Sequence, residues 1–232
     1  MEMKEMQSHA GCVSLVPIFN HLDEESMRKI ATKARHKDLK RGEYLYQAAD
    51  EDDTVYIVHK GQVRIFHLSE SGKEQLIRIL NPGDFTGEWT IFSANTFHEN
   101  YAEATRDSAI CIISRNDLLG LLEEYPKISM VILSSMSERL QQSEKQTASV
   151  ATESVINRII YYLEDLAGSE AADSATVRLP MTRKDLASYL GTTPETLSRK
   201  FKELENNGLI QQLPKNEINI PSMEEMLFSV ED

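Results

Sequence analysis

The chain has 232 residues and a net charge of −12, with 27% charged and 41% hydrophobic residues. This length and composition are typical of a globular protein with one large domain or two small ones. No apolar run approaches the roughly 18 residues of a membrane span, and the first residues lack the apolar core of a signal peptide. We therefore expect a cytoplasmic protein with no membrane partner. The acidity is uneven, because residues 176–215 hold seven Lys or Arg and four Asp or Glu. Such a local positive charge is typical of a segment that contacts phosphates.

The first half of the chain predicts a small helix followed by an all-β domain. Apolar residues recur at helical spacing between residues 15 and 34, and short alternating runs then follow up to residue 113. Gly61, Gly72 and Gly83 punctuate these runs at intervals of eleven residues, as turns between short strands do. We therefore expect a β-roll, or double-stranded jelly roll. Its predicted strands are 43–46, 55–58, 62–66, 75–80 and 109–113.

Two helices are predicted after the β-roll, a short one over 116–124 and a long one over 126–146. The long helix carries one stripe at spacings of three and four, with the candidate interface residues Ile128, Ile132, Ser135, Met136 and Arg139. Two interpretations of this stripe are open. It packs against the same helix of a second copy, as in a coiled coil, or it packs on the β-roll of its own chain. We favour the homodimer, because the later residues 182–207 predict a helix-turn-helix, and proteins with this motif usually bind palindromic DNA as two-fold dimers.

The polar stretch 146–153 predicts a hinge and a domain boundary, so we divide the chain into 1–125, 126–146 and 147–232. The overall class is α+β. The elements expected in the last domain are a helix over 155–166, a strand over 176–180, a helix-turn-helix over 182–207, a β-hairpin wing over 209–220 and a short tail helix over 222–228.

The stretch 182–207 carries paired helix-start and turn signals. Thr182 is a candidate N-cap, Gly191 permits a left-handed turn, and Thr193 followed by Pro194 starts a second helix. An ordinary pair of helices with solvated charges is the alternative interpretation. Two caps and a turn glycine, together with an outward Glu/Ser/Arg set, favour a helix-turn-helix that enters a major groove.

The outward residues of the second helix have the chemistry of DNA readers. Arginine can hydrogen-bond guanine O6 and N7, and glutamate can accept from the cytosine N4 amine. The predicted base-reading residues are Glu195, Ser198 and Arg199. Side chains near helix starts, together with one further lysine, would contact phosphates of double-stranded DNA. These are Thr182, Arg183, Thr193, Thr196 and Lys202.

This order of parts resembles the Crp/Fnr family of transcription regulators over nearly the whole chain. The most specific motifs are residues 56–66 (YIVHKGQVRIF), residues 81–88 (NPGDFTGE), and Thr182-Arg183 followed by residues 195–199 (ETLSR). The resemblance implies a cyclic-nucleotide-binding-type β-roll, a dimerisation helix, a winged helix-turn-helix and RNA polymerase as a partner. The ETLSR set matches the fumarate-nitrate-regulator pattern, which implies an FNR-like palindrome of the form TTGAT-N4-ATCAA.

The positions that bind the signal in the cyclic-AMP-binding members are only partly matched in this sequence. Gly87 and Glu88 match the first phosphate-binding pair of the cyclic-AMP-binding members, but His98 and Glu99 stand where the Arg-Ser pair is expected. Without that arginine the cyclic phosphate has no bidentate cation, so we do not expect cyclic AMP as the signal.

The chain has two cysteines, Cys12 and Cys111, and so falls short of the four ligands of an iron–sulfur cluster. It looks more like the two-cysteine FNR-like (Flp-type) regulators, which implies a Cys12/Cys111 thiol–disulfide switch. Three alternatives remain open: an inert buried thiol at Cys111, a metal site at His9 and Cys12, and an unknown small-molecule ligand in the β-roll.

An enzyme is not expected. The six histidines show no arrangement of nucleophile, base and orienting group, and no Walker A loop, zinc-protease helix or nucleophile elbow is present. The sequence therefore predicts a redox-sensing DNA-binding regulator without metal or other cofactor.

Overall fold

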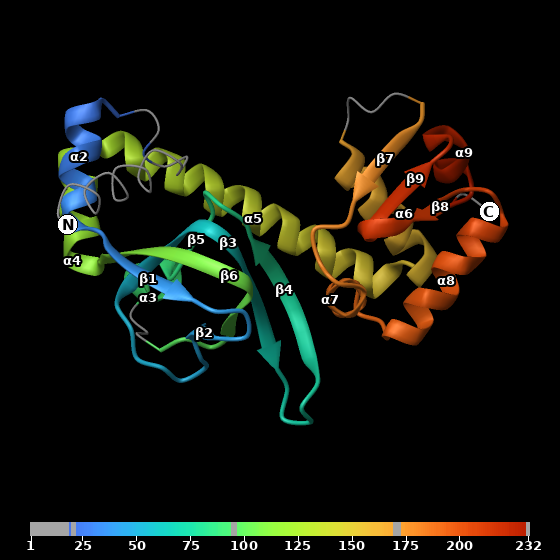
Figure 1. Ribbon diagram of the computed structural model, residues 1–232, viewed down its shortest axis with the longest axis horizontal. Coiled ribbons are helices and arrows are strands. Elements are labelled where there is room, and N and C mark those ends of the chain that lie inside the picture. The colour runs from blue at the N-terminus through green and yellow to red at the C-terminus, as the bar shows by residue number, and fades with distance from the viewer. Residues whose placement is uncertain (1–18, 20–21, 94–96, 169–172, 231–232) are drawn as a thin grey trace. The chain divides into compact units, whose positions relative to one another are not determined.

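The computed structural model describes residue 19 and residues 22–93, 97–168 and 173–230 (Figure 1). The chain divides into two compact units, residues 1–139 and residues 140–232. Among the described helices, none combines the length and the apolar character that crossing a bilayer requires.

The first unit is built on an antiparallel sheet that closes into a roll. Its strands are β1 (Arg35–Leu39), β2 (Tyr44–Tyr46), β3 (Thr54–Leu68), β4 (Glu74–Leu80), β5 (Phe85–Thr86) and β6 (Tyr101–Ser114). The central order is β1-β6-β3-β4, with β2 paired to β6 and β5 paired to β3. The predicted β-roll is thereby confirmed.

One turn assignment is wrong. The predicted strands 55–58 and 62–66 form a single strand, β3, which runs through Gly61. The register against β6 shifts on both sides of this glycine, as at a β-bulge. Gly61 has a φ of +92°, and a Cβ there would collide with the backbone and side chain of Ser108 on β6. The glycine permits a close strand approach instead of a hairpin.

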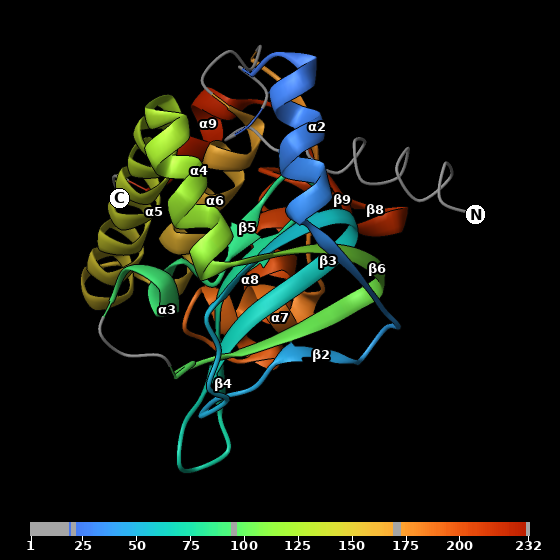
Figure 2. The ribbon, with the colours of Figure 1, turned by 90° about the vertical axis from the view of Figure 1, so that its left-hand side faces the viewer.

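Helices cover one side of the roll. They are α2 (Glu24–Lys33), α3 (Glu88–Phe92), α4 (Arg115–Glu124) and the first part of α5 (Pro126–Thr152). Figure 2 shows α4 and α5 side by side above the strands. Their apolar faces share one core with the sheet, which includes Ile30 of α2, Leu118 of α4 and Ile128 of α5.

The predicted dimer stripe of α5 faces the β-roll of its own chain. Ile128 and Ile132 are buried in the shared core, Met136 packs against it, and Arg139 hydrogen-bonds Glu88. Because these side chains pack within their own chain, their predicted assignment to a dimer interface is wrong. Ser135, the remaining residue of the predicted stripe, is half-buried. The amphipathic pattern identified a packing face but not its partner.

The expected hinge at 146–153 is wrong as well, because α5 continues to Thr152. Thr147 and Thr152 donate to the carbonyl oxygens of Ser143 and Ala148 at 2.8 and 2.9 Å. Hydroxyl groups that bond back by one turn are accommodated inside a helix. The polar composition therefore does not interrupt it.

The second unit contains the end of α5, α6 (Val155–Ala167), β7 (Ala175–Arg178), α7 (Arg183–Tyr189), α8 (Pro194–Asn206), β8 (Gln211–Leu213), the 3-10 turn η1 (Pro214–Asn216), β9 (Glu217–Ile220) and α9 (Met223–Phe228). Its strands form an antiparallel sheet in the order β7-β9-β8. One core unites α6, α7, α8 and this sheet. The helix-turn-helix, the hairpin wing and the tail helix are confirmed.

Candidate nucleic-acid interface

The first helix of the motif, α7, starts as its capping residues predict. Thr182 Oγ1 accepts from the Asp185 N–H at 3.1 Å and donates to Asp185 Oδ2 at 2.7 Å. Leu186 and Ala187 then lie buried in the unit core. This reciprocal pair satisfies a helix-start N–H that would otherwise lack an acceptor.

The turn between α7 and α8 is closed by backbone hydrogen bonds and a buried arginine. The Thr192 N–H donates to Ala187 O at 2.9 Å, and Gly191 has a φ of +65°, a conformation that favours glycine. From α6, the buried Arg158 donates through Nη1 to Leu190 O. The guanidinium thus satisfies a carbonyl at the end of α7 and holds the turn against α6.

The second helix, α8, begins at the predicted cap. Thr193 Oγ1 accepts from the Thr196 N–H at 3.2 Å, and Pro194 occupies the first turn. Leu197, Phe201 and Leu204 are buried. Their spacing fixes the rotation of α8 and turns the opposite face outward.

That outward face carries the predicted base-reading set. Glu195, Ser198 and Arg199 are all exposed, as is Lys202 one turn further on. The pKa of Glu195 is held below its usual value by its own backbone N–H and by a hydrogen bond from Thr193. The carboxyl is therefore an ionised acceptor at the helix start.

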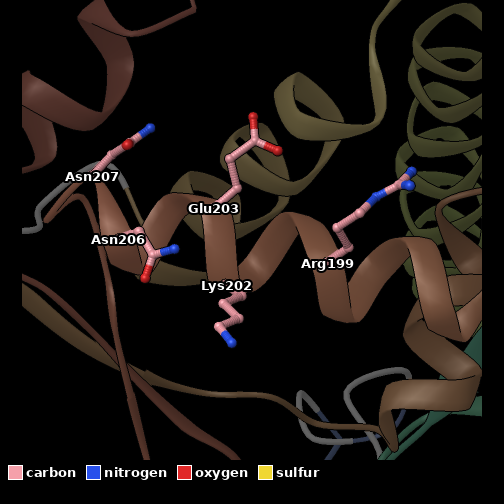
Figure 3. A pocket seen from close by; sticks show the side chains of 5 residues that line it. All are labelled: Arg199, Lys202, Glu203, Asn206 and Asn207. Carbon is pink, nitrogen blue, oxygen red and sulfur yellow. The ribbon is translucent and has the colours of Figure 1, made fainter.

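A pocket continues this face toward the end of α8 (Figure 3). Arg199 and Glu203 project to one side of the helix in this view, and Lys202 projects to the other. Sequence reasoning missed the residues that line the rest of it. These are Glu203, Asn206 and Asn207, and their positions four, seven and eight residues after Arg199, at helical spacing, were the signal that could have found them.

Among the predicted phosphate contacts, Arg183 is held more firmly than expected. Its guanidinium lies 4.0 Å from the centre of the Phe201 ring, and Nη2 donates to Gln212 Oε1 of β8 at 3.2 Å. Glu205 accepts from the Gln212 N–H at 2.8 Å. These contacts tie α7, α8 and the wing together, so Arg183 orders the interface in addition to carrying charge toward it. Thr182 is exposed, and the Thr193 hydroxyl bonds that of Thr196 at 3.3 Å.

Cys111, one of the two predicted redox residues, belongs to the first unit. Cys111 is 2% exposed on β6, directly across from His36 of β1, whose Nδ1 lies 4.0 Å from the sulfur. Cys12 and His9 lie outside the described residues. Within the ranges that the structure describes, no group of three or more His, Cys, Asp or Glu is arranged to hold a metal ion.

Two residues at the expected phosphate-binding positions, Glu88 and His98, are occupied by intrachain contacts. The buried Glu88 accepts through Oε1 from Arg78 and from Arg139, each at 2.9 Å. His98 Nε2 lies 3.1 Å from Asp52 Oδ2, and the His98 ring stacks on Tyr46 with centroids 3.7 Å apart. Sequence reasoning identified Glu88 and His98 but not their partners, which come from β2, β4, α5 and the segment just before β3.

The comparisons with known proteins agree with both halves of this architecture. Residues 36–125 match the cyclic nucleotide-binding domain family, and residues 157–227 match the Crp-like helix-turn-helix domain family. The chain is 34% identical over 219 residues to the probable transcriptional regulator flp of Lacticaseibacillus casei, covering 93% of this chain and 96% of that relative.

Two further similarities extend the comparison. The chain is 31% identical over 195 residues to the regulatory protein HlyX of Actinobacillus pleuropneumoniae, covering 83% and 80% of the two chains. The solved structure of FixK2 from Bradyrhizobium japonicum has a TM-score of 0.71 at 22% identity, over 84% of this chain and 96% of that one. At this identity the structural likeness supports the fold.

Proposed function

This chain belongs to the Crp/Fnr family of transcription regulators, and from that premise we propose that it binds, as a homodimer, a palindrome of the form TTGAT-N4-ATCAA. The observation that carries this proposal is the exposed Glu195, Ser198 and Arg199 edge on a helix whose other face is buried. Arg199 donates to the guanine of each half-site, and Glu195 accepts from the cytosine paired with a guanine. RNA polymerase is the expected further partner, and the proposal includes no catalytic step.

The proposed signal is the redox state of Cys12 and Cys111. Two thiols become one disulfide, releasing two protons and two electrons to an oxidant such as a small-molecule disulfide, which is reduced to two thiols. Support comes from the sequence pair and from the position of Cys111 in the core that also contains Ile128 and Ile132 of α5. A bond at Cys111 would act on the same core on which α5 rests.

Cyclic AMP and an iron–sulfur cluster are not part of the proposal. The Glu88 oxygen that faces Arg78 and Arg139 is already paired, and His98 is paired with Asp52 where an arginine would be needed. Two cysteines provide half of the usual cluster ligands. The signal therefore requires no resident cofactor.

The test is a titration of fluorescently labelled DNA with reduced and oxidised full-length protein. We expect binding to the TTGAT palindrome that is about 10³-fold or more tighter than binding to a scrambled duplex at the same salt concentration. In the wild type, the reduced and the oxidised protein should bind the palindrome with different affinities. In Cys12→Ser the two affinities should be equal.

Each half of the proposal has its own contradicting outcome. Equal affinity for the palindrome and the scrambled duplex contradicts the assigned site. Redox-independent binding to the palindrome contradicts the thiol switch alone, and a response to a small-molecule extract in Cys12→Ser would assign control to a β-roll ligand instead.

A further inference from the structure

The carbonyl groups at the end of α7 are hydrogen-bonded by groups from outside this helix. A helix leaves its last four carbonyl groups without donors of its own. The turn that follows α7 supplies two donors: the Thr192 N–H bonds Ala187 O at 2.9 Å, and the Gly191 N–H bonds Ser188 O at 3.1 Å. Side chains from two other helices bond the next two carbonyl groups along the chain.

Those two side chains come from α5 and α6. The half-buried Gln146 of α5 donates through Nε2 to Tyr189 O at 2.8 Å. Arg158 of α6 donates through Nη1 to Leu190 O. The end of α7 is therefore bonded to both helices that precede it in the chain.

Val150 gives α5 a second contact with the same turn. It follows Gln146 by one helical turn, and its Cγ1 lies 3.2 Å from the position that a Cβ on Gly191 would take. All of these residues belong to the second unit, and Figure 1 shows α7 beside the last turns of α5. The last turns of α5 thus make one polar and one apolar contact with the turn that leads into α8.

These contacts bridge a short connection between helices. Only Glu153 and Ser154 separate α5 from α6, and α6 packs in one core with α7 and α8. A few residues at the end of a helix are enough to absorb a change in the angle between two elements. The bond from Gln146 and the contact of Val150 oppose such a change, because they join α5 directly to the far side of this connection.

We propose that Gln146 is a positioning residue for DNA recognition, whose hydrogen bond to the turn fixes the angle between α5 and α8 and so sets the spacer length that the homodimer prefers. The inference rests on the proposed function and adds a residue outside the reading helix. Because the chain enters the second unit through α5, the separation of the two α8 helices in the homodimer depends on this angle. One added base pair moves a half-site by about 3.4 Å and rotates it by about 34° around the duplex. A fixed attachment therefore favours one spacer.

The test measures binding of the full-length protein to duplexes in which the TTGAT and ATCAA half-sites are separated by three, four or five base pairs. The readout is the ratio of the dissociation constants for the altered spacers to that for the four-base-pair spacer. A change in net charge, in stability or in the active fraction affects all three duplexes equally and cancels in this ratio. For the wild type we expect a ratio of at least about ten, because a misplaced half-site loses base contacts.

Substitutions of Gln146 separate its hydrogen bond from its size and charge. Gln146→Ala should reduce the ratio about fivefold, the effect of one lost hydrogen bond. Gln146→Glu keeps the size but removes the donor, so it should reduce the ratio at least as much. Gln146→Lys keeps a donor for the carbonyl group at the negative end of α7 and should retain the wild-type ratio. The matched control is Gln142→Ala, at an exposed glutamine one turn earlier on α5, which should leave the ratio unchanged.

The outcomes distinguish this inference from the proposed function. A wild-type ratio in Gln146→Ala overturns the inference, as does equal binding of the wild type to all three spacers; both results leave the half-sites standing if a scrambled duplex is still rejected. Equal binding of the wild type to the four-base-pair palindrome and to the scrambled duplex contradicts the proposed function and this inference with it. On a duplex with a single TTGAT half-site, Gln146→Ala should bind as the wild type does. Weaker binding there would show that the contact shapes α8 itself, and would also overturn the inference.

Discussion

Asp52 shows how one carboxylate organises the inside of the β-roll. Its Oδ1 accepts from the Thr54 hydroxyl at 2.6 Å, and its Oδ2 accepts from the Tyr56 hydroxyl and faces His98 Nε2. Burial alone would raise the pKa of Asp52, but the hydrogen bonds from His98, Thr54 and Tyr56 together hold it below its usual value. The ionised form is therefore the one that the fold stabilises.

This arrangement predicts an acid-sensitive part of the stability. A carboxyl with a lowered folded-state pKa stabilises the fold above its unfolded value of 3.8 and loses that contribution as the pH falls. We expect Asp52→Asn to lower the free energy of unfolding of the β-roll by roughly 1–3 kcal/mol at neutral pH. The difference from the wild type should shrink as the pH falls below about 4, as measured by urea unfolding at a series of pH values. A difference that stays constant or grows toward acid would refute this account of Asp52.

At the residue scale, sequence reasoning succeeded where one helix decides the outcome. Glu195, Ser198 and Arg199 are exposed because the buried spacing of Leu197 and Phe201 fixes the face on which they lie. Sequence reasoning did not predict contacts between residues from distant segments. Nothing local indicates that Arg78 and Arg139 share the Glu88 carboxylate, because the three residues come from separate elements.

At the scale of elements, the turn of the helix-turn-helix depends on a glycine with two separate requirements. Gly191 has a φ of +65°, and a Cβ there would lie 3.2 Å from Arg158 Nη1 and from Val150 Cγ1. Gly208, after the end of α8, also has a positive φ of +76°, but no heavy atom lies within 4 Å of its Cβ position. The two glycines thus share the backbone requirement and differ in crowding.

This pair of positions gives a matched prediction. Gly208→Ala should cost about 1 kcal/mol of unfolding free energy, because its left-handed backbone is unfavourable for alanine. Gly191→Ala should cost more, since it also displaces Arg158 from the turn carbonyl. Thermal unfolding of the two variants compares these costs. Equal losses would show that the Arg158 contact contributes nothing to holding the turn.

At the same scale, local sequence signals predicted the elements correctly, and signals that depend on distant segments did not. Caps and turn residues act within a few positions, so the helix-turn-helix was predicted to within a residue or two at each helix. The division of β3 at Gly61 was wrong because a bulge is defined by the opposite strand, at Ser108. The stripe of α5 was assigned to the wrong partner because periodicity identifies a buried face without identifying what covers it.

At the scale of the whole molecule, the proposed function requires two copies acting on one palindrome. In the proposed homodimer each copy contributes one α8, and its two-fold symmetry would match the inverted repeat of the DNA. Chain-wide acidity does not oppose this, because the positive charge is concentrated in residues 176–215. The structure places the stripe that the sequence assigned to the dimer against the β-roll of its own chain.

The most direct measurement titrates wild type and Arg199→Ala with three duplexes: the TTGAT palindrome, the same duplex with the guanine of one half-site replaced, and the duplex with both replaced. For the wild type we predict a loss of about 1–3 kcal/mol of binding free energy at each replaced guanine. Arg199→Ala should bind all three duplexes with nearly equal affinity, while Lys202→Ala should weaken binding to all three and retain the discrimination. Full discrimination of the guanines by Arg199→Ala would contradict the assignment of α8 as the reader of this palindrome.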